Sequence, residues 1–452
     1  MNRRELLAMA ATGAFAAEHL NRAPISNANL TVKLPQAEPV RLPNGITVLA
    51  VEDNRLPIAL VRFQMEGAGS IYSPRPGVAK LTAEMLREGA AGRSGKQIVD
   101  EAARLGTVLG TAEGSGLTSR VFDWIDLLTS LVLHPTFPAD EFSGVRQRML
   151  VLARLRVTRP VNVAQDTATS SPSVRIRPRE RLRRPNRWPR SRPKCSRRER
   201  YTPGNLVVSC IGRVRPAAFA SHIEKRLGSW KAPDVNATLP PNPQPATARR
   251  IVLIDRPGAA QTELAIGGLL FDRRDPDWFP MLVMNSVFGG GINSRLVRIL
   301  RYEKGYVFSV QSIATASRFP GVWQVRAATR TDATADSLAI ILAQLRRLCD
   351  EPIPSAELEA AKRGAVGNFA LNLEQPAQVL TQSYLRHRYG FSPDYWERYP
   401  AKIMAVTSGE AQVVAQKYLA PDRALIVAVG DATRIRPALE KLGKVEALVT
   451  RA

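Results

Sequence analysis

Three residues of one predicted helix, Lys80, Ala83 and Glu84, have the spacing that places side chains on a common helix face. The helix is predicted to start at Pro76, a residue that favours helix starts, and to stop at Gly89, a residue that favours helix ends. A protonated lysine has no lone pair to give to a metal ion, and an alanine cannot act as a base. Glu84 could bind a metal, but one carboxylate is not a metal site. This face therefore predicts no catalytic residue and no metal site.

Local signals on either side of this helix predict the elements that hold it. A strand is expected directly upstream, over residues 58–63, where apolar and β-branched residues cluster. Before it, the pair Asn44 and Gly45 predicts a hairpin with a type I′ turn. Downstream, Ser94 and Gln97 have the spacing of a capping box that opens the next helix.

The predicted helix and its flanks resemble the zinc-binding helix of the pitrilysin/insulinase peptidases, the inverted zincins. In that family the helix carries His-x-x-Glu-His; its histidines bind zinc, and its glutamate polarises a zinc-bound water. Gly77 and Met85 set the register of the comparison, and the three motif positions are then Lys80, Ala83 and Glu84. The resemblance therefore implies a zinc-peptidase helix without its catalytic and metal-binding residues.

The third zinc ligand of the family is missing as well. In active members it is a glutamate on a later helix, and residues 142–165 of this chain contain neither Asp nor Glu. The metal chemistry is thus lost at two separate places. The resemblance implies that the chain holds no cofactor, that zinc belongs only to a partner subunit, and that the chain is inactive alone.

A glycine run in the second part of the chain, Gly289, Gly290 and Gly291, matches the Gly-Gly-Gly-x-x-Ser-Arg-Leu pattern of the same family. Glycines let the backbone turn sharply or approach another chain closely. They do not form a phosphate loop, because the Gly-Lys-Ser/Thr sequence is absent. A plain turn between helices and a substrate contact both fit the run, and the resemblance favours a substrate contact.

The family also carries an arginine and, seven residues later, a tyrosine that reach the substrate. The arginine position is Arg301, for which a plain surface or ion-pair role stays open. The tyrosine position is Phe308, which keeps the ring but loses the hydroxyl donor. Tyr306 is expected on the same face of a strand as Phe308 and would partly replace it. The resemblance thus predicts Arg301 and Phe308 as substrate-binding residues.

The composition allows a large globular protein with an uneven charge. The chain has 452 residues, of which 44% are hydrophobic, and a formal net charge of +24. Its three cysteines form no Cys-x-x-Cys pair, which excludes a zinc knuckle and a redox motif of that type. Residues 171–200 hold twelve arginines, one lysine and two glutamates, so nearly half of the surplus charge lies there.

Two origins stay open for the Arg/Pro-rich segment 171–200. As a genuine segment it would be a nucleic-acid-binding tract, and binding would then depend steeply on salt and vanish on its deletion. As a compensated pair of frameshifts it would replace a Phe-Gly-x-His-Pro-Tyr-type segment of the family, because arginine codons slipped by one base often read as Ala or Gly. Stop codons in the slipped frame would contradict the frameshift. We expect no nucleic-acid partner, and we expect the segment to leave its place in the first domain unfilled.

The chain ends and linkers divide the rest of the sequence. Paired arginines before an apolar run, with a small-x-small site at Ala14 to Ala16, are typical of a twin-arginine or general secretory signal peptide; a short amphipathic helix is the alternative. The signal would make the chain periplasmic or secreted. The predicted divisions are a signal peptide over 1–17, a linker over 18–38, an N-terminal peptidase-like domain over 39–230, a linker over 231–248 and a C-terminal peptidase-like domain over 249–445.

The resemblance implies an α+β fold of two tandem homologous domains, each an antiparallel sheet covered by helices, as in mitochondrial-processing-peptidase-like metallohydrolases. It implies a non-catalytic, substrate-binding and chamber-forming subunit of a heteromeric zinc metallopeptidase. The partner would be a His-x-x-Glu-His subunit and the substrate a peptide. The alternative is a scaffold or assembly protein with no proteolytic role. A gene product that folds poorly, because its first half is altered, is a last alternative.

Overall fold

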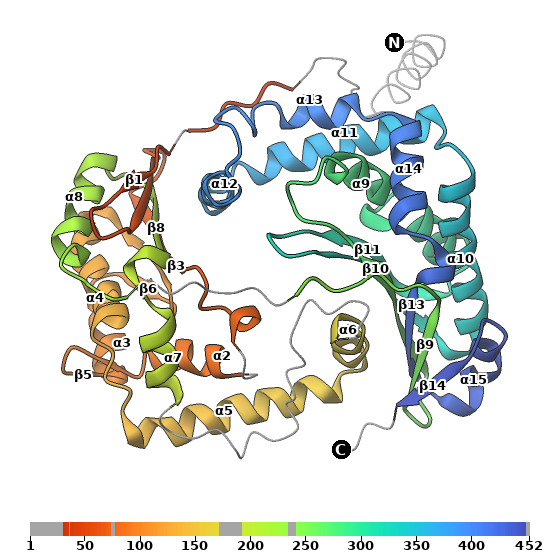
Figure 1. The fold of residues 1–452 in the computed structure, drawn as a ribbon, viewed down its shortest axis with the longest axis horizontal. Coiled ribbons are helices and arrows are strands. Elements are labelled where there is room, and N and C mark those ends of the chain that lie inside the picture. The colour runs from red at the N-terminus through yellow and green to blue at the C-terminus, as the bar shows by residue number, and fades with distance from the viewer. Residues whose placement is uncertain (1–29, 36, 74–76, 171–191, 234–240, 449–452) are drawn as a thin grey trace, which may run out of the picture.

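The computed structural model describes residues 30–35, 37–73, 77–170, 192–233 and 241–448. The predicted signal peptide over 1–17 lies outside these residues. The part of the chain before the linker at 231–248 is called the first half below, and the part after it the second half. Figure 1 shows a sheet in each half, with helices on the outer side of both sheets. None of the described helices is long and apolar enough to cross a membrane.

In the described part of the first half, six strands form one sheet in the order β1-β2-β8-β3-β7-β6. These strands are β1 (Val40–Arg41), β2 (Thr47–Glu52), β3 (Ile58–Met65), β6 (Thr107–Leu109), β7 (Glu113–Leu117) and β8 (Leu206–Gly212). A small hairpin of β4 (Gly89–Ala90) and β5 (Arg93–Ser94) lies apart from it. The helical elements are η1 (Ser70–Tyr72), α2 (Val78–Met85), α3 (Gly95–Arg104), η2 (Thr118–Arg120), α4 (Val121–Leu133), α5 (Ala139–Thr158), α6 (Pro160–Ser170), α7 (Arg192–Arg200), η5 (Pro203–Asn205) and α8 (Pro216–Leu227).

The second half repeats this plan with the order β11-β12-β10-β13-β9-β14 among its described strands. These are β9 (Arg250–Asp255), β10 (Gln261–Leu269), β11 (Val307–Thr315), β12 (Val322–Arg330), β13 (Leu425–Gly430) and β14 (Val445–Leu448). The helical elements are α9 (Trp278–Asn285), the π-helical turns η6 (Ser286–Gly290) and η7 (Val297–Glu303), η8 (Thr331–Ala333), α10 (Thr334–Asp350), α11 (Ser355–Asn372), α12 (Pro376–Tyr389), α13 (Tyr399–Ala405), α14 (Ser408–Tyr418), η9 (Pro421–Arg423) and α15 (Ala432–Glu440).

The two sheets show that the chain is a tandem repeat, as predicted. Read from opposite ends, the orders match for five strands, with β3 equivalent to β10 and β8 equivalent to β13. The sixth strands differ, because β1 pairs with β2 antiparallel whereas β14 pairs with β9 in parallel. The predicted α+β class is therefore confirmed. The sheets are not purely antiparallel, because β2 pairs with β8 in parallel, and β9 pairs in parallel with both β13 and β14.

The predicted hairpin between β1 and β2 forms, but its turn is not type I′. That turn needs positive φ at both central residues, and Gly45 has φ +93° while Asn44 has no positive φ. Proline fixes φ near −65°, so Pro43 occupies the second position of an ordinary turn instead. The Gly45 N–H closes this turn by donating to the Leu42 carbonyl at 2.9 Å.

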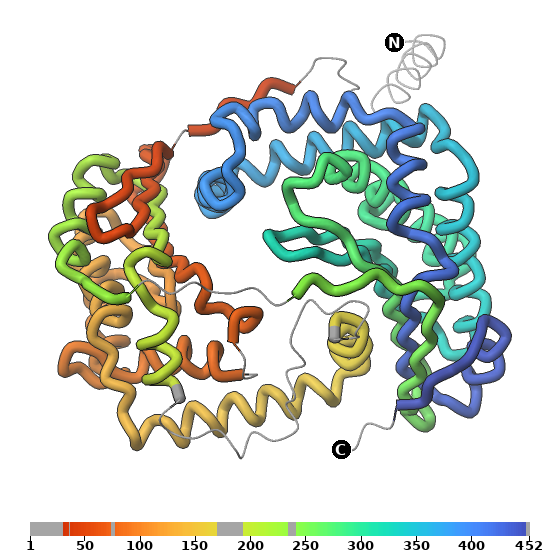
Figure 2. Tube along the Cα trace, in the orientation of Figure 1, coloured from red at the N-terminus to blue at the C-terminus, as the bar shows by residue number. Residues whose placement is uncertain are grey.

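The halves exchange helices across their interface. From the first half, α6 buries Val163, Ala164 and Ala168 against β9, β10 and β13 of the second sheet. In return, α12 of the second half buries Val379 and Leu380 against β2 and β8 of the first sheet. Figure 2 shows how the long helix α5 leads from the first half to α6 at the second. Each sheet thus has one face completed by the other half.

A polar contact fixes α12 to the end of β3 as well. The Glu66 carboxylate accepts a hydrogen bond from the Tyr384 hydroxyl at 2.9 Å and pairs with Arg388. Arg318, from the connection between β11 and β12, lies 3.8 Å from the same carboxylate. Glu66 therefore joins the first half to two parts of the second.

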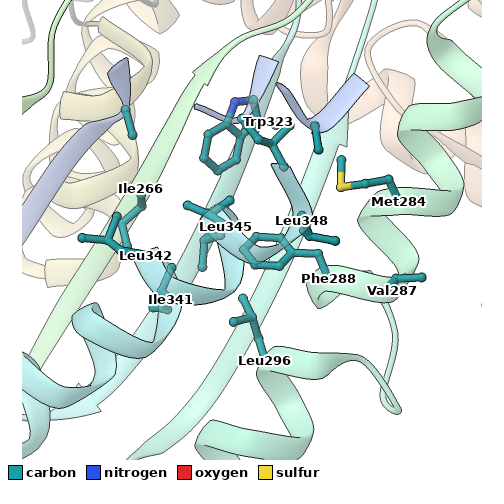
Figure 3. Packing of buried hydrophobic residues seen from close by; sticks show 14 of the residues in the cluster. Ile266, Met284, Val287, Phe288, Leu296, Trp323, Ile341, Leu342, Leu345 and Leu348 are labelled. Carbon is teal, nitrogen blue, oxygen red and sulfur yellow. The ribbon is translucent and has the colours of Figure 1, made fainter. Parts of the chain in front are cut away.

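The second half has the larger apolar core, built where α9, η6 and α10 cover the sheet. Figure 3 shows the Phe288 ring pointing into this cluster beside Leu345 and Leu348. Trp323 from β12 is buried at its edge and donates its indole N–H to the Tyr418 carbonyl at 2.7 Å. The second half therefore has one continuous apolar core.

Two segments, the predicted linker over 18–38 and the Arg/Pro-rich segment over 171–200, make contacts that the sequence did not predict. Residues 30–35, 37 and 38 of the predicted linker form no helix or strand, yet Val32 packs into an aromatic cluster with Phe369 and Trp396 of the second half. The Arg/Pro-rich segment was expected to leave its place unfilled, but its last part, α7, packs against α2. Residues 171–191 lie outside the described residues.

The packing of α7 has a clear physical cause in Arg197. Its guanidinium donates to the Val132 and Leu133 carbonyls at 2.8 and 3.0 Å, which lie at the C-terminal end of α4. The last carbonyls of a helix have no partner within the helix, and a cation there satisfies them. Arg197 also lies 5.9 Å from the centre of the Trp230 ring. One arginine of a run that looks like a solvated charge tract is therefore a helix cap.

Candidate functional site

The zinc-helix stretch forms a shorter helix than predicted. Helix α2 spans Val78–Met85 and begins after Gly77, whose φ of +82° suits only glycine. Pro76 lies outside the described residues, and Gly89 belongs to β4 instead of ending the helix. The buried residues of α2 are Val78, Leu81, Thr82 and Met85, which form one stripe along the helix.

The three motif positions lie on a different side of α2 from this stripe. Lys80 is exposed, and Ala83 and Glu84 are half-buried. Lys80 and Ala83 line a cavity of about 540 Å³, whereas Glu84 is not part of its lining. The position that would hold a second metal ligand therefore does not face the same space as the other two.

The cavity is closed by residues from distant parts of the chain. Phe63 and Met65 come from β3, and Thr111 and Ala112 come from the connection between β6 and β7. Its other polar walls are Ser70, Arg156, Asp166, Thr169 and Tyr201. The sequence placed only α2 at this site and missed every one of these polar residues.

The one carboxylate in the cavity wall is already engaged. Asp166 of α6 receives two hydrogen bonds from the Arg156 guanidinium of α5, at 2.8 and 2.7 Å. Such a two-pronged pair fixes both groups in one geometry. Asp166 is also the first acidic residue after the acid-free stretch 142–165, which is the only sequence signal that could have singled it out.

Tyr201 also lines the cavity. Burial raises the pKa of its hydroxyl to about 12, although the charge of Arg197 acts in the opposite direction. The hydroxyl is therefore protonated at neutral pH and can act as a hydrogen-bond donor. It cannot serve as an anionic metal ligand there.

These residues do not fit a zinc ion. Lys80 is a cation, Ala83 offers no donor atom, and Asp166 is held by Arg156. Among the described residues there is no group of three His, Cys, Asp or Glu side chains that could hold a metal ion. No hydrolytic step is therefore assigned to this chain.

The glycine run of the second half lies at the joint between η6 and β11. Gly289 is buried, and a Cβ atom added to it would come within 2.8 Å of the Ser312 Cβ on β11. Asn285 reinforces this contact, because its amide donates to the Ser312 carbonyl at 3.1 Å. Gly289 is therefore needed for close packing. Gly290 and Gly291 are exposed, and their predicted substrate contact stays a prediction.

The serine, arginine and leucine after the glycines are buried and structural. Arg295 has a side chain that is only 5% exposed, and its guanidinium donates to both oxygens of Glu357 at 2.8 and 2.7 Å. This pair joins the loop after η6 to the first turn of α11. The sequence pattern indicated the arginine but not its partner.

Arg301 and Phe308 are both exposed, but Tyr306 does not take the place predicted for it. The register of β11 shifts between Val307 and Ser309, so Phe308 is the extra residue of a bulge. Phe308 is 77% exposed, whereas Tyr306 is half-buried against the core of the second half. A bulge redirects the side chain that it contains. Tyr306 and Phe308 therefore do not share a face.

Comparison with known proteins agrees with these features. Residues 195–365 match the family described as the peptidase M16 inactive domain. The chain is similar to M16 peptidases through this match, which covers less than half of its residues. The family resemblance predicted from the α2 stretch is confirmed, and the match begins inside the Arg/Pro-rich segment that the prediction left out.

The curated relatives are uncharacterized zinc proteases. One from Mycobacterium tuberculosis is 27% identical over 231 residues, which cover 49% of this chain and 50% of that protein. The zinc protease YmxG of Bacillus subtilis is 27% identical over 183 residues, covering 40% of this chain and 44% of that protein. The chain thus spans about half the length of the curated relatives that it matches.

Solved structures extend the similarity to most of the fold. A peptidase M16 inactive domain from Pseudomonas fluorescens has a TM-score of 0.77 at 22% identity, covering 87% of this chain and 98% of its own. A protease from Helicobacter pylori has a TM-score of 0.80 at 18% identity, covering 88% and 100%. At these identities the comparison establishes the two-half M16 fold alone.

Proposed function

We propose that this chain is the non-catalytic, peptide-binding and chamber-forming subunit of a heteromeric M16 zinc peptidase. The observation that carries the proposal is the cavity beside α2, where Lys80 and Ala83 stand at the positions of a zinc ligand and a base. In this proposal the chain keeps the cavity beside α2 but lacks the residues that bind zinc and activate water. In this proposal the partner subunit supplies His-x-x-Glu-His, and the match to the M16 inactive domain supports such a pairing.

Two edge strands support peptide binding. β6 ends the first sheet and β11 ends the second, so each has backbone groups that face away from its own sheet. Val108 on β6 is 76% exposed and Phe308 on β11 is 77% exposed. An extended peptide can add to such an edge through main-chain hydrogen bonds, and the exposed apolar residues would contact its side chains.

Arg301 supports the proposal because its guanidinium is accessible to a peptide. It is exposed, and it forms no ion pair with any residue that the structure describes. Its guanidinium lies 6.0 Å from the Tyr302 ring, a contact that leaves its donors open to solvent. We therefore assign Arg301 a contact to a peptide carbonyl or carboxylate, and we assign further peptide contacts to Phe308 and to the exposed Gly290 and Gly291.

The proposal places both subunits in the periplasm or outside the cell. The signal-peptide pattern over residues 1–17 is its basis. A substrate-handling pair must be exported together, so the partner is expected to carry a signal of its own.

The test is co-expression of the full chain with a His-x-x-Glu-His subunit from the same genome. Size-exclusion chromatography reports assembly, and hydrolysis of a quenched fluorescent peptide reports activity. We expect a one-to-one complex that hydrolyses the peptide faster than the zinc subunit alone. Arg301→Gln should lower kcat/KM of the complex about three- to tenfold by removing a charged hydrogen bond.

The matched control is Arg434→Gln, which removes an exposed arginine on α15 in the same half. It should leave kcat/KM unchanged. A chain that stays soluble but forms no complex would favour the scaffold alternative. Peptide hydrolysis by the isolated chain in the presence of zinc would contradict the proposal.

A further inference from the structure

The cavity beside α2 has the size and lining of a small-ligand site. Its volume of about 540 Å³ lies within the range of about 300–1,000 Å³ that is usual for ligand pockets. Apolar walls come from Phe63, Met65, Leu86 and Val132. Such a lining accommodates an apolar side chain, and a few polar groups would fix its orientation.

The charged side chains that line the cavity have a net charge of one positive unit. They belong to Lys80, Arg156 and Asp166, and the last two form the two-pronged ion pair described above. Lys80 forms no ion pair or side-chain hydrogen bond with any described residue. Its neighbour Glu84 does not line the cavity. The ammonium group of Lys80 is thus the charge that an anion entering the cavity would meet.

Hydroxyl groups surround the same space. Ser70 and Tyr201 line it, and the Tyr201 hydroxyl is protonated. Thr169 lines it too, but its hydroxyl already donates to the Gln165 carbonyl at 2.9 Å. An ionised carboxylate accepts several hydrogen bonds, and hydroxyls can donate to the oxygen that the ammonium does not reach. A single surplus charge suits a carboxylate better than a phosphate, which carries up to two.

We propose that the cavity beside α2 binds a peptide carboxylate, with Lys80 as its counter-ion and an adjacent apolar side chain against Phe63 and Met65. This inference rests on the proposed function, because it names what part of the peptide occupies the chamber of this subunit. The substitution that removed a metal ligand would then have created an anion site at the same place. The carboxylate can come from the peptide C-terminus or from an acidic side chain.

Isothermal titration calorimetry on the full chain at 0.15 M salt distinguishes these sources. The probes are three hexapeptides that end in leucine: one with a free C-terminal carboxylate, one amidated, and one amidated with an internal glutamate. We expect the free-acid or the glutamate peptide to bind about five- to tenfold more tightly than the plain amide, as a charge-assisted hydrogen bond provides. The tighter of the two identifies the source of the carboxylate.

Lys80→Gln should abolish this preference and leave the affinity for the amidated peptide unchanged. The control Lys441→Gln removes an exposed lysine at the end of α15 and should keep the preference, which separates the site from the general positive charge of the chain. Because Lys80 is exposed, its substitution should not unfold the protein, and an unchanged Tm verifies this.

The inference is overturned if Lys80→Gln keeps the preference, or if the wild-type chain binds all three peptides equally. In both cases peptide binding and the proposed function stand. Binding of no peptide by a chain that still assembles with the zinc subunit overturns the inference and removes peptide binding from the proposed function. A chain that binds the carboxylate peptide but forms no complex keeps the inference and contradicts the subunit assignment.

Discussion

The two halves share one strand order but differ beside the first helix that follows their central strands. In the first half, α2 borders a cavity and turns Lys80 towards it. In the second half, the equivalent α9 and η6 bury Met284, Val287 and Phe288 against the helices of a continuous core. The same topology therefore supports an open face and a filled one. The difference teaches that side chains on one helix face, and not the sheet, decide where a site can exist.

The largest loss of stability is expected when a buried side chain is removed from the core of the second half. Phe288→Ala removes a fully buried ring from the second-half core and should lower the free energy of unfolding by about 3–5 kcal/mol. Urea denaturation followed by tryptophan fluorescence measures it. The matched change on the open side is Ala83→Leu, which extends a side chain into the cavity and should alter stability by less than about 1 kcal/mol. Equal losses from both variants would contradict the contrast between the halves.

A smaller effect is expected at the glycine joint. Gly289→Ala would force a Cβ atom to within 2.8 Å of the Ser312 Cβ, which should cost about 1–3 kcal/mol of stability. Gly364→Ala is the control, because nothing lies within 4 Å of its added Cβ in the middle of α11. That change should stabilise by about 0.5–1 kcal/mol. If Gly289→Ala is also tolerated, the glycine serves substrate contact and not packing.

Breaking the polar contact between the halves should have a smaller effect on stability. Glu66→Gln removes the charge that pairs with Arg388 and keeps an acceptor for the Tyr384 hydroxyl. We expect a loss of about 1 kcal/mol, since the side chains of Arg388 and Glu66 are still 18% and 24% exposed and the variant keeps a hydrogen-bond acceptor. Hydrogen exchange of α12 backbone amides should accelerate while that of α10 stays constant. Unchanged exchange in α12 would show that its apolar contacts alone hold the halves together.

The smallest effect is a pH dependence located on α12. Burial lowers the pKa of His387, and Arg386 and Arg41 act in the same direction, while the charge of Glu66 opposes them. As the pH falls below about 6.5, the unfolded chain binds this proton first, so stability should decrease until the folded His387 is protonated too. His387→Gln should remove this slope in urea titrations between pH 7 and 5. A slope that persists in the variant would assign it to other groups.

Local signals predicted much of the fold. The capping box at Ser94 was predicted correctly, because the groups that it joins lie within four residues of one another. The strand over residues 58–63 and the helix after it were also predicted correctly, since each depends on signals within one element. The turn before β2 was read wrongly, because Pro43 outweighed the Asn-Gly signal.

Features that depend on distant parts of the chain escaped prediction. Arg156 and Asp166 meet because α5 ends at Thr158 and α6 begins at Pro160, and nothing in the type of either residue indicates its partner. The bulge at Phe308 depends on its pairing with β12, and the role of Arg197 depends on the end of α4. The sequence thus indicated which chemistry α2 lacks, while only the fold shows what stands around it.

The most direct test of the central claim is the zinc content of the isolated chain. The full chain is dialysed against micromolar zinc, washed, and analysed by plasma mass spectrometry, alongside a triple variant with Lys80→His, Ala83→Glu and Glu84→His. We predict well under one zinc per wild-type chain, no peptide hydrolysis, and increased zinc retention in the triple variant. One tightly held zinc per wild-type chain, lost on Glu84→Gln, would show that the chain carries a metal centre and would contradict its assignment as a non-catalytic subunit.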